Sequence, residues 1–148
     1  MDKLPLKIKC LRGSSMPAYA SAGAAAFDLC ASVDKAVTIP ARSRALIPSG
    51  IAIELPSAGY VALVFARSGL AVKKGLALSN GVGVIDSDYR GEILVGMINS
   101  SDEDCEILPG ERIAQLAVIP VCACELIKTD ELGKTMRGAG GFGSTGRL

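Results

Sequence analysis

Residues 79–99 read SNGVGVIDSDYRGEILVGMIN, two apolar runs on either side of a polar centre. Both runs have the length of strands, and the centre is made of the Asp, Ser and Gly residues that usually form turns. The pattern predicts a β-hairpin with its tip at residues 86–91. Two residues distinguish it from an ordinary solvated tip: Asp86 directly follows apolar residues, and Tyr89 is aromatic.

Short apolar or alternating runs, separated by Gly, Pro and polar residues, continue along most of the chain. Their spacing of about 8–12 residues is typical of a sandwich, jelly roll or barrel, so the expected fold class is all-β. One short helix is expected at residues 68–74, where a serine precedes several helix formers. Strands are expected at residues 6–11, 36–39, 45–47, 51–55, 60–66, 76–78, 82–85, 93–98, 105–108 and 112–121.

A chain of 148 residues fits a single domain, and no linker divides it. The composition changes at Gly133, after which glycine is frequent and apolar residues are few. We therefore expect a β domain at residues 1–132 and a mobile arm at residues 133–148. The arm contains the glycine spacing of a dinucleotide-binding motif, but no strand precedes it and too few residues follow for the helix, so this interpretation is rejected.

The charge and the hydropathy of the chain limit its partners. The net charge is +1 with 21% charged residues, which disfavours a nucleic-acid surface or a polybasic membrane anchor. Mean hydropathy is +0.38, but the longest apolar candidate, residues 113–127, is interrupted by polar residues and proline and is too short to span a bilayer. The apolar surplus indicates subunit interfaces, hence a homo-oligomer. The N-terminus has no apolar signal region, so we expect a cytoplasmic protein.

Cysteine and histidine restrict the possible chemistry. The five cysteines lack disulfide-scaffold spacing and are expected to be reduced, buried thiols, with Cys122 and Cys124 packing in the core rather than binding metal. The chain contains no histidine, which excludes Ser-His-Asp and Cys-His mechanisms and histidine-ligated metals. A general base must be a carboxylate, or less often Lys, Tyr or Cys.

Four further segments have both a structural and a functional interpretation. ARSGLAVKKG (residues 66–75) is an anion site or a capped helix with a surface arginine. Asp28, between apolar neighbours, is a paired structural acid or part of a site. Gln115 interrupts an apolar strand and needs a hydrogen-bond partner from protein or ligand. RGAGGFGST (residues 137–145) is a frayed terminus or a segment that folds over a phosphorylated ligand.

In order along the chain, these segments resemble the five motifs of the trimeric dUTPase family. The matching segments run from residue 22 to residue 145 and read AGAAAFDL, ARSGLA, SNGVGVIDSDYRGE, PGERIAQL and RGAGGFGST. The third and fifth are the most specific. Departures are mild: Ala66 stands where proline is common, and Glu111 where aspartate is frequent.

The resemblance implies a jelly-roll-like β-barrel assembled as a homotrimer, with three active sites shared between subunits. The implied reaction is hydrolysis of dUTP to dUMP and pyrophosphate, which limits uracil incorporation into DNA and supplies dUMP for dTMP synthesis. The implied location is the cytoplasm, or also the nucleus in a eukaryote. Two alternatives are a dCTP deaminase of the same fold and a non-catalytic, nucleotide-binding regulatory trimer.

The resemblance also implies roles for the nucleoside-binding residues. Asp86 is the expected general base, which activates a water for in-line attack on the α-phosphorus. Tyr89 is expected to stack on the deoxyribose and to exclude a 2′-hydroxyl. The uracil edge is expected to be bound by Asn80, Gly83, Val84, Ile85 and Leu94.

A second group is implied to bind the triphosphate. In the barrel it consists of Arg67, Ser68, Gly69 and Gln115, with Asp28 supporting the site indirectly. In the tail, Phe142 is expected to cover the uracil, and the phosphates are expected to be covered by Arg137, Gly143, Ser144 and Thr145. Mg²⁺ is expected to arrive with the triphosphate, held mainly by phosphate oxygens and water and by no direct protein ligand.

Overall fold

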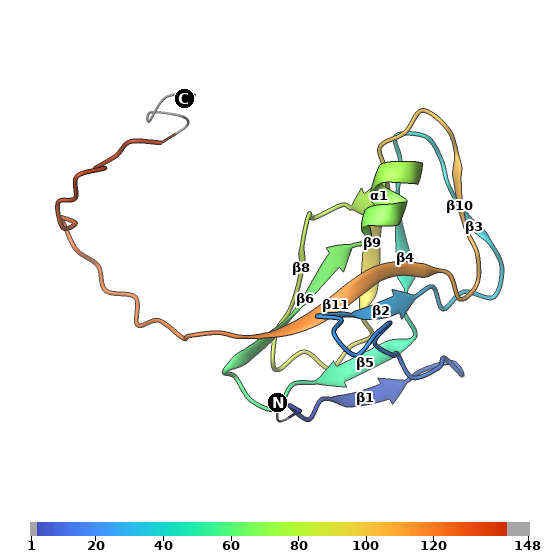
Figure 1. Ribbon diagram of the computed structural model, residues 1–148, viewed down its shortest axis with the longest axis horizontal. Helices are drawn as coiled ribbons and strands as arrows, with labels where there is room; N and C mark the ends of the chain where they lie inside the picture. Colours follow the sequence, from blue (N-terminus) through green and yellow to red (C-terminus); the bar gives the residue numbers. More distant parts are fainter. Residues whose placement is uncertain (1–2, 142–148) are drawn as a thin grey trace.

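The computed structural model describes residues 3–141, which form eleven strands and one helix (Figure 1). The expected all-β class with one short helix is confirmed. The helix is α1 (Ser68–Lys74), and the strands are β1 (Lys7–Cys10), β2 (Phe27–Cys30), β3 (Val37–Ile39), β4 (Arg44–Pro48), β5 (Ile51–Glu54), β6 (Tyr60–Ala66), β7 (Leu76–Leu78), β8 (Gly83–Ile85), β9 (Leu94–Asn99), β10 (Cys105–Ile107) and β11 (Arg112–Pro120).

All strand pairs are antiparallel, and the strands form four sheets around one core (Figure 1). The largest sheet has the strand order β2-β11-β6-β8, and a second sheet has the order β4-β9-β7. Two two-stranded sheets, β1-β5 and β3-β10, complete the barrel. The long strand β11 pairs with β2 on one side and β6 on the other, with a register shift between Arg112 and Ala114. This arrangement places the second and fourth motifs beside the first.

The prediction of a β-hairpin at residues 79–99 is wrong, because its two strands do not pair with each other. β8 pairs with β6, whereas β9 pairs with β4 and β7, so the two strands belong to different sheets. The backbone shows why they separate: the Ile93 amide donates to Ile51 O at 2.9 Å, and the Ser49 amide donates to Ile93 O at 3.1 Å. Residues 86–92 therefore connect two different sheets, and each end of this connection is held by a strand of its own sheet.

The core is filled by apolar side chains that alternate along the strands. In β9 every second residue is buried, which places Val95 and Met97 inside the barrel. The buried Asn99 is satisfied, because its Nδ2 donates to Ile39 O at 3.0 Å and to Glu103 O at 2.8 Å. Among the described residues, no buried side-chain nitrogen or oxygen lacks a hydrogen-bond partner. The core therefore gives the surface residues of the barrel a rigid support.

Helix α1 fixes the position of Arg67 at the end of β6. Arg67 occupies the N-cap in an extended conformation, and Leu70 is the buried residue of the helix. The helix ends at Gly75, which has φ +66°, a left-handed conformation that glycine adopts without strain. A Cβ on Gly75 would also lie 3.1 Å from the Ser101 backbone nitrogen. The turn at Gly75 thus returns the chain to the barrel as β7.

The chain leaves the barrel after β11. Residues 121–141 contain no helix or strand, residues 121–139 are exposed, and the segment extends away from the barrel (Figure 1). Within residues 3–141 there is no helix long and apolar enough to span a membrane.

The expectation of buried cysteines is wrong for the single chain. Four of the five cysteines are exposed, only Cys105 is partly buried, and all five are free thiols. Cys122 and Cys124 lie beyond the end of β11, where no other strand covers them. Cys30 takes an outward-facing position of β2, between the buried Leu29 and Ala31.

Candidate functional site

A pocket of about 180 Å³ lies at the end of β8. A volume of this order is large enough for one six-membered ring. Five predicted site residues contribute to its lining, and two unpredicted residues complete it. The lining consists of Val84, Ile85, Asp86, Tyr89, Glu92, Ile93 and Leu94.

Two of the side chains that line this pocket are apolar and yet exposed, and a polar side chain lies near the start of β8. Val84 is 61% exposed and Leu94 is 46% exposed, although both are apolar. Gly83 pairs with Val64 of β6, and a Cβ on Gly83 would lie 3.0 Å from Val64 Cβ and 3.8 Å from Asn80 Nδ2. Asn80 therefore lies beside the start of β8, but neither Asn80 nor Gly83 is among the residues that line the pocket.

The segment between β8 and β9 is stabilised by its own polar contacts. The Tyr89 amide donates to Asp86 O at 3.2 Å, and Arg90 Nη1 donates to Ser87 O at 2.7 Å. The Tyr89 hydroxyl donates to Glu92 O at 2.9 Å. These contacts hold Asp86 and Tyr89 at the same pocket.

Asp86 is exposed, and it takes part in none of the six ion pairs formed between described residues. Its carboxylate lines the pocket at the end of β8 and is not engaged by a cation of the described residues. The position follows from sequence, because β8 ends with apolar Ile85 and the next side chain emerges at the pocket.

The pocket is also lined by Glu92, whose carboxylate is 16% exposed. Arg12 donates to both of its oxygens, with Arg12 Nη1 2.8 Å from Oε2. The Gly50 amide donates to Oε1 at 2.8 Å. The hydrogen bond from Arg12 is the main cause that lowers the pKa of the Glu92 carboxyl, and burial opposes it.

We expect Glu92 to contribute to stability in a pH-dependent way. Because its folded-state pKa lies below the ordinary value of 4.5, the contribution is complete above that pH and disappears as the pH falls through the lowered pKa. The difference in free energy of unfolding between the wild type and Glu92→Gln is expected to be constant from about pH 7 to about pH 5 and to shrink below about pH 4.5. Urea unfolding at four pH values measures it.

The matched control is Glu54→Gln. Glu54 also pairs with a cation, Lys7 at 2.8 Å, but both side chains are much more exposed than Glu92. A smaller difference from the wild type is therefore expected at every pH. A Glu92→Gln difference that persists unchanged down to about pH 3 would contradict the assignment.

A second group of predicted residues gathers where β2, β11 and the end of β6 meet. Asp28 is opposite Gln115 in the β2-β11 ladder, so their side chains share a face. Asp28 Oδ1 lies 3.0 Å from Arg67 Nε, and Asp28 Oδ2 lies 3.1 Å from Arg112 Nη1. Gln115 Nε2 donates to Ala66 O at 3.2 Å. The group presents two guanidinium groups, an arrangement suited to binding an anion.

Asp28 orients the two arginines of this group, and both oxygens of its carboxylate are occupied by them. Its carboxylate is 15% exposed and each oxygen faces one arginine. Arg67 Nη1 also donates to Arg112 O at 3.1 Å, so the two arginines are linked through the backbone as well. Asp28 and Arg112 also line a larger pocket of about 630 Å³, which lies against residues 12–20.

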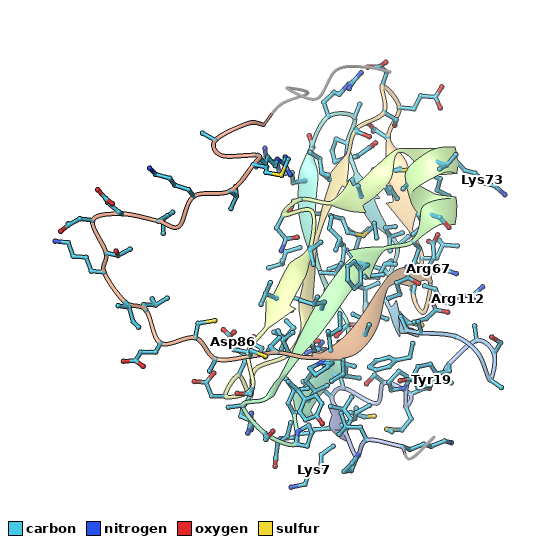
Figure 2. All side chains as sticks on the ribbon, turned by 60° about the vertical axis from the view of Figure 1, so that its left-hand side comes forward. Lys7, Tyr19, Arg67, Lys73, Asp86 and Arg112 are labelled. Carbon is cyan, nitrogen blue, oxygen red and sulfur yellow. The ribbon has the colours of Figure 1, made fainter. Side chains whose placement is uncertain are left out.

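The two groups lie apart in a single chain (Figure 2). Asp86 is at one end of the barrel, whereas Arg67 and Arg112 are together at another edge. One chain therefore does not bring the predicted carboxylate and the predicted anion-binding arginines into one site.

The tail residues are only partly described. Arg137 is exposed, and its Nε donates to Gly140 O at 2.9 Å. The positions predicted to cover a ligand, Phe142, Gly143, Ser144 and Thr145, lie outside the described residues.

Three charged residues of the site were not among the predicted site residues: Arg12, Glu92 and Arg112. Each forms a contact over a long separation in sequence, 80 residues for Arg12 with Glu92 and 84 for Arg112 with Asp28. A signal existed for Glu92 alone, since an acid placed directly before the buried Ile93 needs a partner.

Comparison with known sequences identifies the family. The family model described as dUTPase matches residues 12–146. The chain belongs to the dUTPase family. The match includes all five segments on which the resemblance rests, so the resemblance is confirmed.

Similar proteins cover almost the whole chain. A deoxyuridine 5′-triphosphate nucleotidohydrolase of Desulfitobacterium hafniense is 54% identical over 99% of this chain and 99% of its own length. The protein of the same name from Paraburkholderia phytofirmans is 45% identical over 98% of this chain and 99% of its own length.

Solved structures of the dUTPase family share the fold. A dUTPase of Staphylococcus bacteriophage 80alpha, solved with dUpNHpp, superposes with a TM-score of 0.86 at 27% identity, covering 96% of this chain and 98% of its own. The Streptococcus mutans dUTPase has a TM-score of 0.72 at 30% identity, covering 80% and 98%. The expected jelly-roll-like fold is thereby confirmed.

Proposed function

We propose that this chain is a dUTP diphosphatase that hydrolyses dUTP to dUMP and pyrophosphate. The main support is the pocket that places Asp86 beside Tyr89 in a chain of the dUTPase family. Relatives with nearly full-length similarity carry the name deoxyuridine 5′-triphosphate nucleotidohydrolase, and a structural neighbour was solved with dUpNHpp. The reaction limits uracil incorporation into DNA and supplies dUMP for dTMP synthesis, and we place it in the cytoplasm, or also in the nucleus if the source is eukaryotic.

Asp86 is the general base in this proposal. Its carboxylate accepts a proton from a water molecule, and the resulting nucleophile attacks the α-phosphorus in line with the bridging oxygen that leaves with pyrophosphate. A positioned base contributes about 10²–10⁴-fold to such a reaction. The absence of histidine from the sequence makes a carboxylate the natural choice.

The pocket selects the nucleoside. Tyr89 stacks on the deoxyribose and leaves no space for a 2′-hydroxyl, while Asn80 and the backbone of Gly83, Val84, Ile85 and Leu94 bind the uracil edge. Cytosine presents the opposite pattern of donors and acceptors, so it leaves polar groups unpaired. Such a mismatch discriminates by about 10⁴–10⁵-fold.

The arginine-rich group binds the triphosphate. Arg67, with Ser68, Gly69 and Gln115, holds the phosphate oxygens, and Asp28 keeps the Arg67 side chain in position through its 3.0 Å contact. Phosphoryl transfer depends mainly on positioning and on neutralising charge, so this group supplies what Asp86 cannot.

A homotrimer completes the site. In one chain Asp86 lies apart from Arg67 (Figure 2). In the proposed trimer a neighbouring copy supplies the missing group. Exposed apolar side chains, among them Leu46 and Val72, are available to bury between subunits. The arm at residues 133–148 closes over a neighbouring subunit's site, with Arg137, Gly143, Ser144 and Thr145 at the phosphates and Phe142 over the uracil.

Mg²⁺ is the expected cofactor. The described residues contain no group of three or more Cys, Asp or Glu side chains arranged for a metal, and both oxygens of Asp28 already face arginines. These residues fit an ion held by phosphate oxygens and water rather than by direct protein ligands. When bound, the ion neutralises charge on the triphosphate.

One assay with four nucleotides tests the proposal. Purified protein with Mg²⁺ is incubated separately with dUTP, dCTP, dTTP and UTP, and pyrophosphate and ammonia are measured. Release of pyrophosphate from dUTP alone is the expected result. Ammonia from dCTP would identify a deaminase, and tight binding of dUTP without hydrolysis would identify a regulatory trimer.

A further inference from the structure

The ring of Tyr89 is constrained from two directions. Its hydroxyl donates to Glu92 O at 2.9 Å, which fixes the far end of the ring. Gly91 lies directly against the ring: a Cβ on Gly91 would be 2.6 Å from Tyr89 Cζ and 3.0 Å from Cε2. No ordinary contact between carbon atoms is that short, so the observed ring position requires glycine at residue 91.

The carbonyl that receives the Tyr89 hydroxyl belongs to a residue held by its own side chain. The Glu92 carboxylate accepts hydrogen bonds from Arg12 through both oxygens and from the Gly50 amide at 2.8 Å. Arg12 follows β1, and Gly50 lies between β4 and β5, so the anchor points come from other parts of the barrel. Charge-assisted, bidentate contacts of this kind fix orientation more strongly than neutral hydrogen bonds.

The anchor points are themselves restrained. Gly50 has φ +72°, and a Cβ there would lie 2.6 Å from Ser14 Cβ and 2.7 Å from Ser32 Cβ. Arg12 has φ 49°, a left-handed conformation that is uncommon for residues other than glycine. The Arg12 guanidinium is thus presented to Glu92 by a turn of defined shape. Arg12 lines the larger pocket and Glu92 the smaller one, so their ion pair lies between the two.

We infer that the Arg12–Glu92 ion pair is a positioning element that sets discrimination against ribonucleotides by fixing the carbonyl to which Tyr89 donates. The inference rests on the proposed function, in which the Tyr89 ring excludes a 2′-hydroxyl. Exclusion by a ring depends on where the ring is, and a displacement of about 1 Å changes the fit of a bound substrate substantially. Arg12 and Glu92 act through Tyr89 rather than on the substrate.

A purely structural ion pair would lower stability and leave selectivity unchanged, so the measured quantity is the ratio of kcat/KM for dUTP to kcat/KM for UTP. Arg12→Gln removes the charge that holds Glu92, and Gly91→Ala displaces the ring directly. Both variants are expected to lower this ratio by about tenfold or more. Arg12→Lys, which retains the charge, is expected to lower it less than Arg12→Gln.

Arg42→Gln is the matched control. Arg42 is also a left-handed arginine, φ 60°, paired with a carboxylate: its Nη2 lies 2.7 Å from Asp102 Oδ1 on the exposed surface. Its substitution is expected to leave the ratio at the wild-type value. In a Tyr89→Phe background the hydroxyl is absent, so adding Arg12→Gln is expected to cause no further change in the ratio.

Binding of the α,β-imido analogues of dUTP and UTP gives the same comparison without turnover. A protein that binds these analogues selectively but hydrolyses nothing would refute the proposed function and leave the inference testable. An unchanged dUTP-to-UTP ratio in either Arg12→Gln or Gly91→Ala overturns the inference. If Arg12→Gln does not fold, the ratio in Glu92→Gln decides, because that variant removes the other partner of the ion pair; Gly91→Ala shows whether the ratio responds to the ring position, since the three atoms nearest to its added methyl group all belong to Tyr89.

Discussion

Asp86→Asn is expected to lower kcat for dUTP by about 10³-fold while changing KM only a few-fold. Asparagine has nearly the same shape as aspartate but cannot take a proton from water. Asp86 belongs to none of the ion pairs between described residues, so the substitution removes no structural contact of that kind. Pyrophosphate release at saturating dUTP measures the effect, and the melting temperature checks that the fold is retained.

Asp88→Asn provides the control for this experiment. Asp88 lies in the same turn and is exposed, but it is not among the residues that line the pocket. The control removes the same charge at a distance of two residues and is expected to retain most of the activity. If Asp86→Asn turned over dUTP as fast as the wild type, Asp86 would not be the base.

The sequence predicts the local elements well because their signals are local. The predicted bounds of β6, α1 and β7 agree with the structure, since each element is delimited by its own apolar run and punctuating residue. β2 was missed. Its four residues, Phe27–Cys30, follow a run of alanines and are too few to establish an alternating pattern.

The pairing of the strands was harder to predict, as the segment at residues 79–99 illustrates. A polar turn between two apolar runs normally indicates a hairpin, but β9 finds its partners in β4 and β7. The choice depends on residues more than 40 positions away, such as Ile51, whose carbonyl receives the Ile93 amide. The residues of the turn alone do not determine which strands β9 pairs with.

The composition of the candidate site was predicted from motif order, but its contacts were not. Asp28 was expected to support the site indirectly, and its two arginine partners give that expectation a geometry. The register shift between Arg112 and Ala114, a β-bulge, sets how Arg112 projects relative to Asp28. Nothing in the local sequence indicates which residue of a strand will bulge.

Ending the chain at Met136 is expected to lower dUTP turnover by about 10³-fold or more. In the proposed mechanism this truncation removes Arg137 and the residues that cover the nucleotide. Loss of a single preorganised donor to the transition state costs about 10²–10³-fold, and the arm brings several. The expected loss is therefore at least as large as that caused by substituting the general base.

The same truncation is expected to leave the barrel intact, because the described part of the segment it shortens packs little against the barrel. Residues 121–139 are exposed and belong to no strand or helix, so the core packed around β11 and β9 does not depend on them. The melting temperature is expected to change by less than about 2 °C, and the elution volume on gel filtration to stay that of the full-length chain. A chain ending at Gly146 retains the fifth motif and should behave as the wild type. Full turnover by the shorter chain would show that the arm is not part of the site, and a later elution than that of the full-length chain would show that the arm holds subunits together instead.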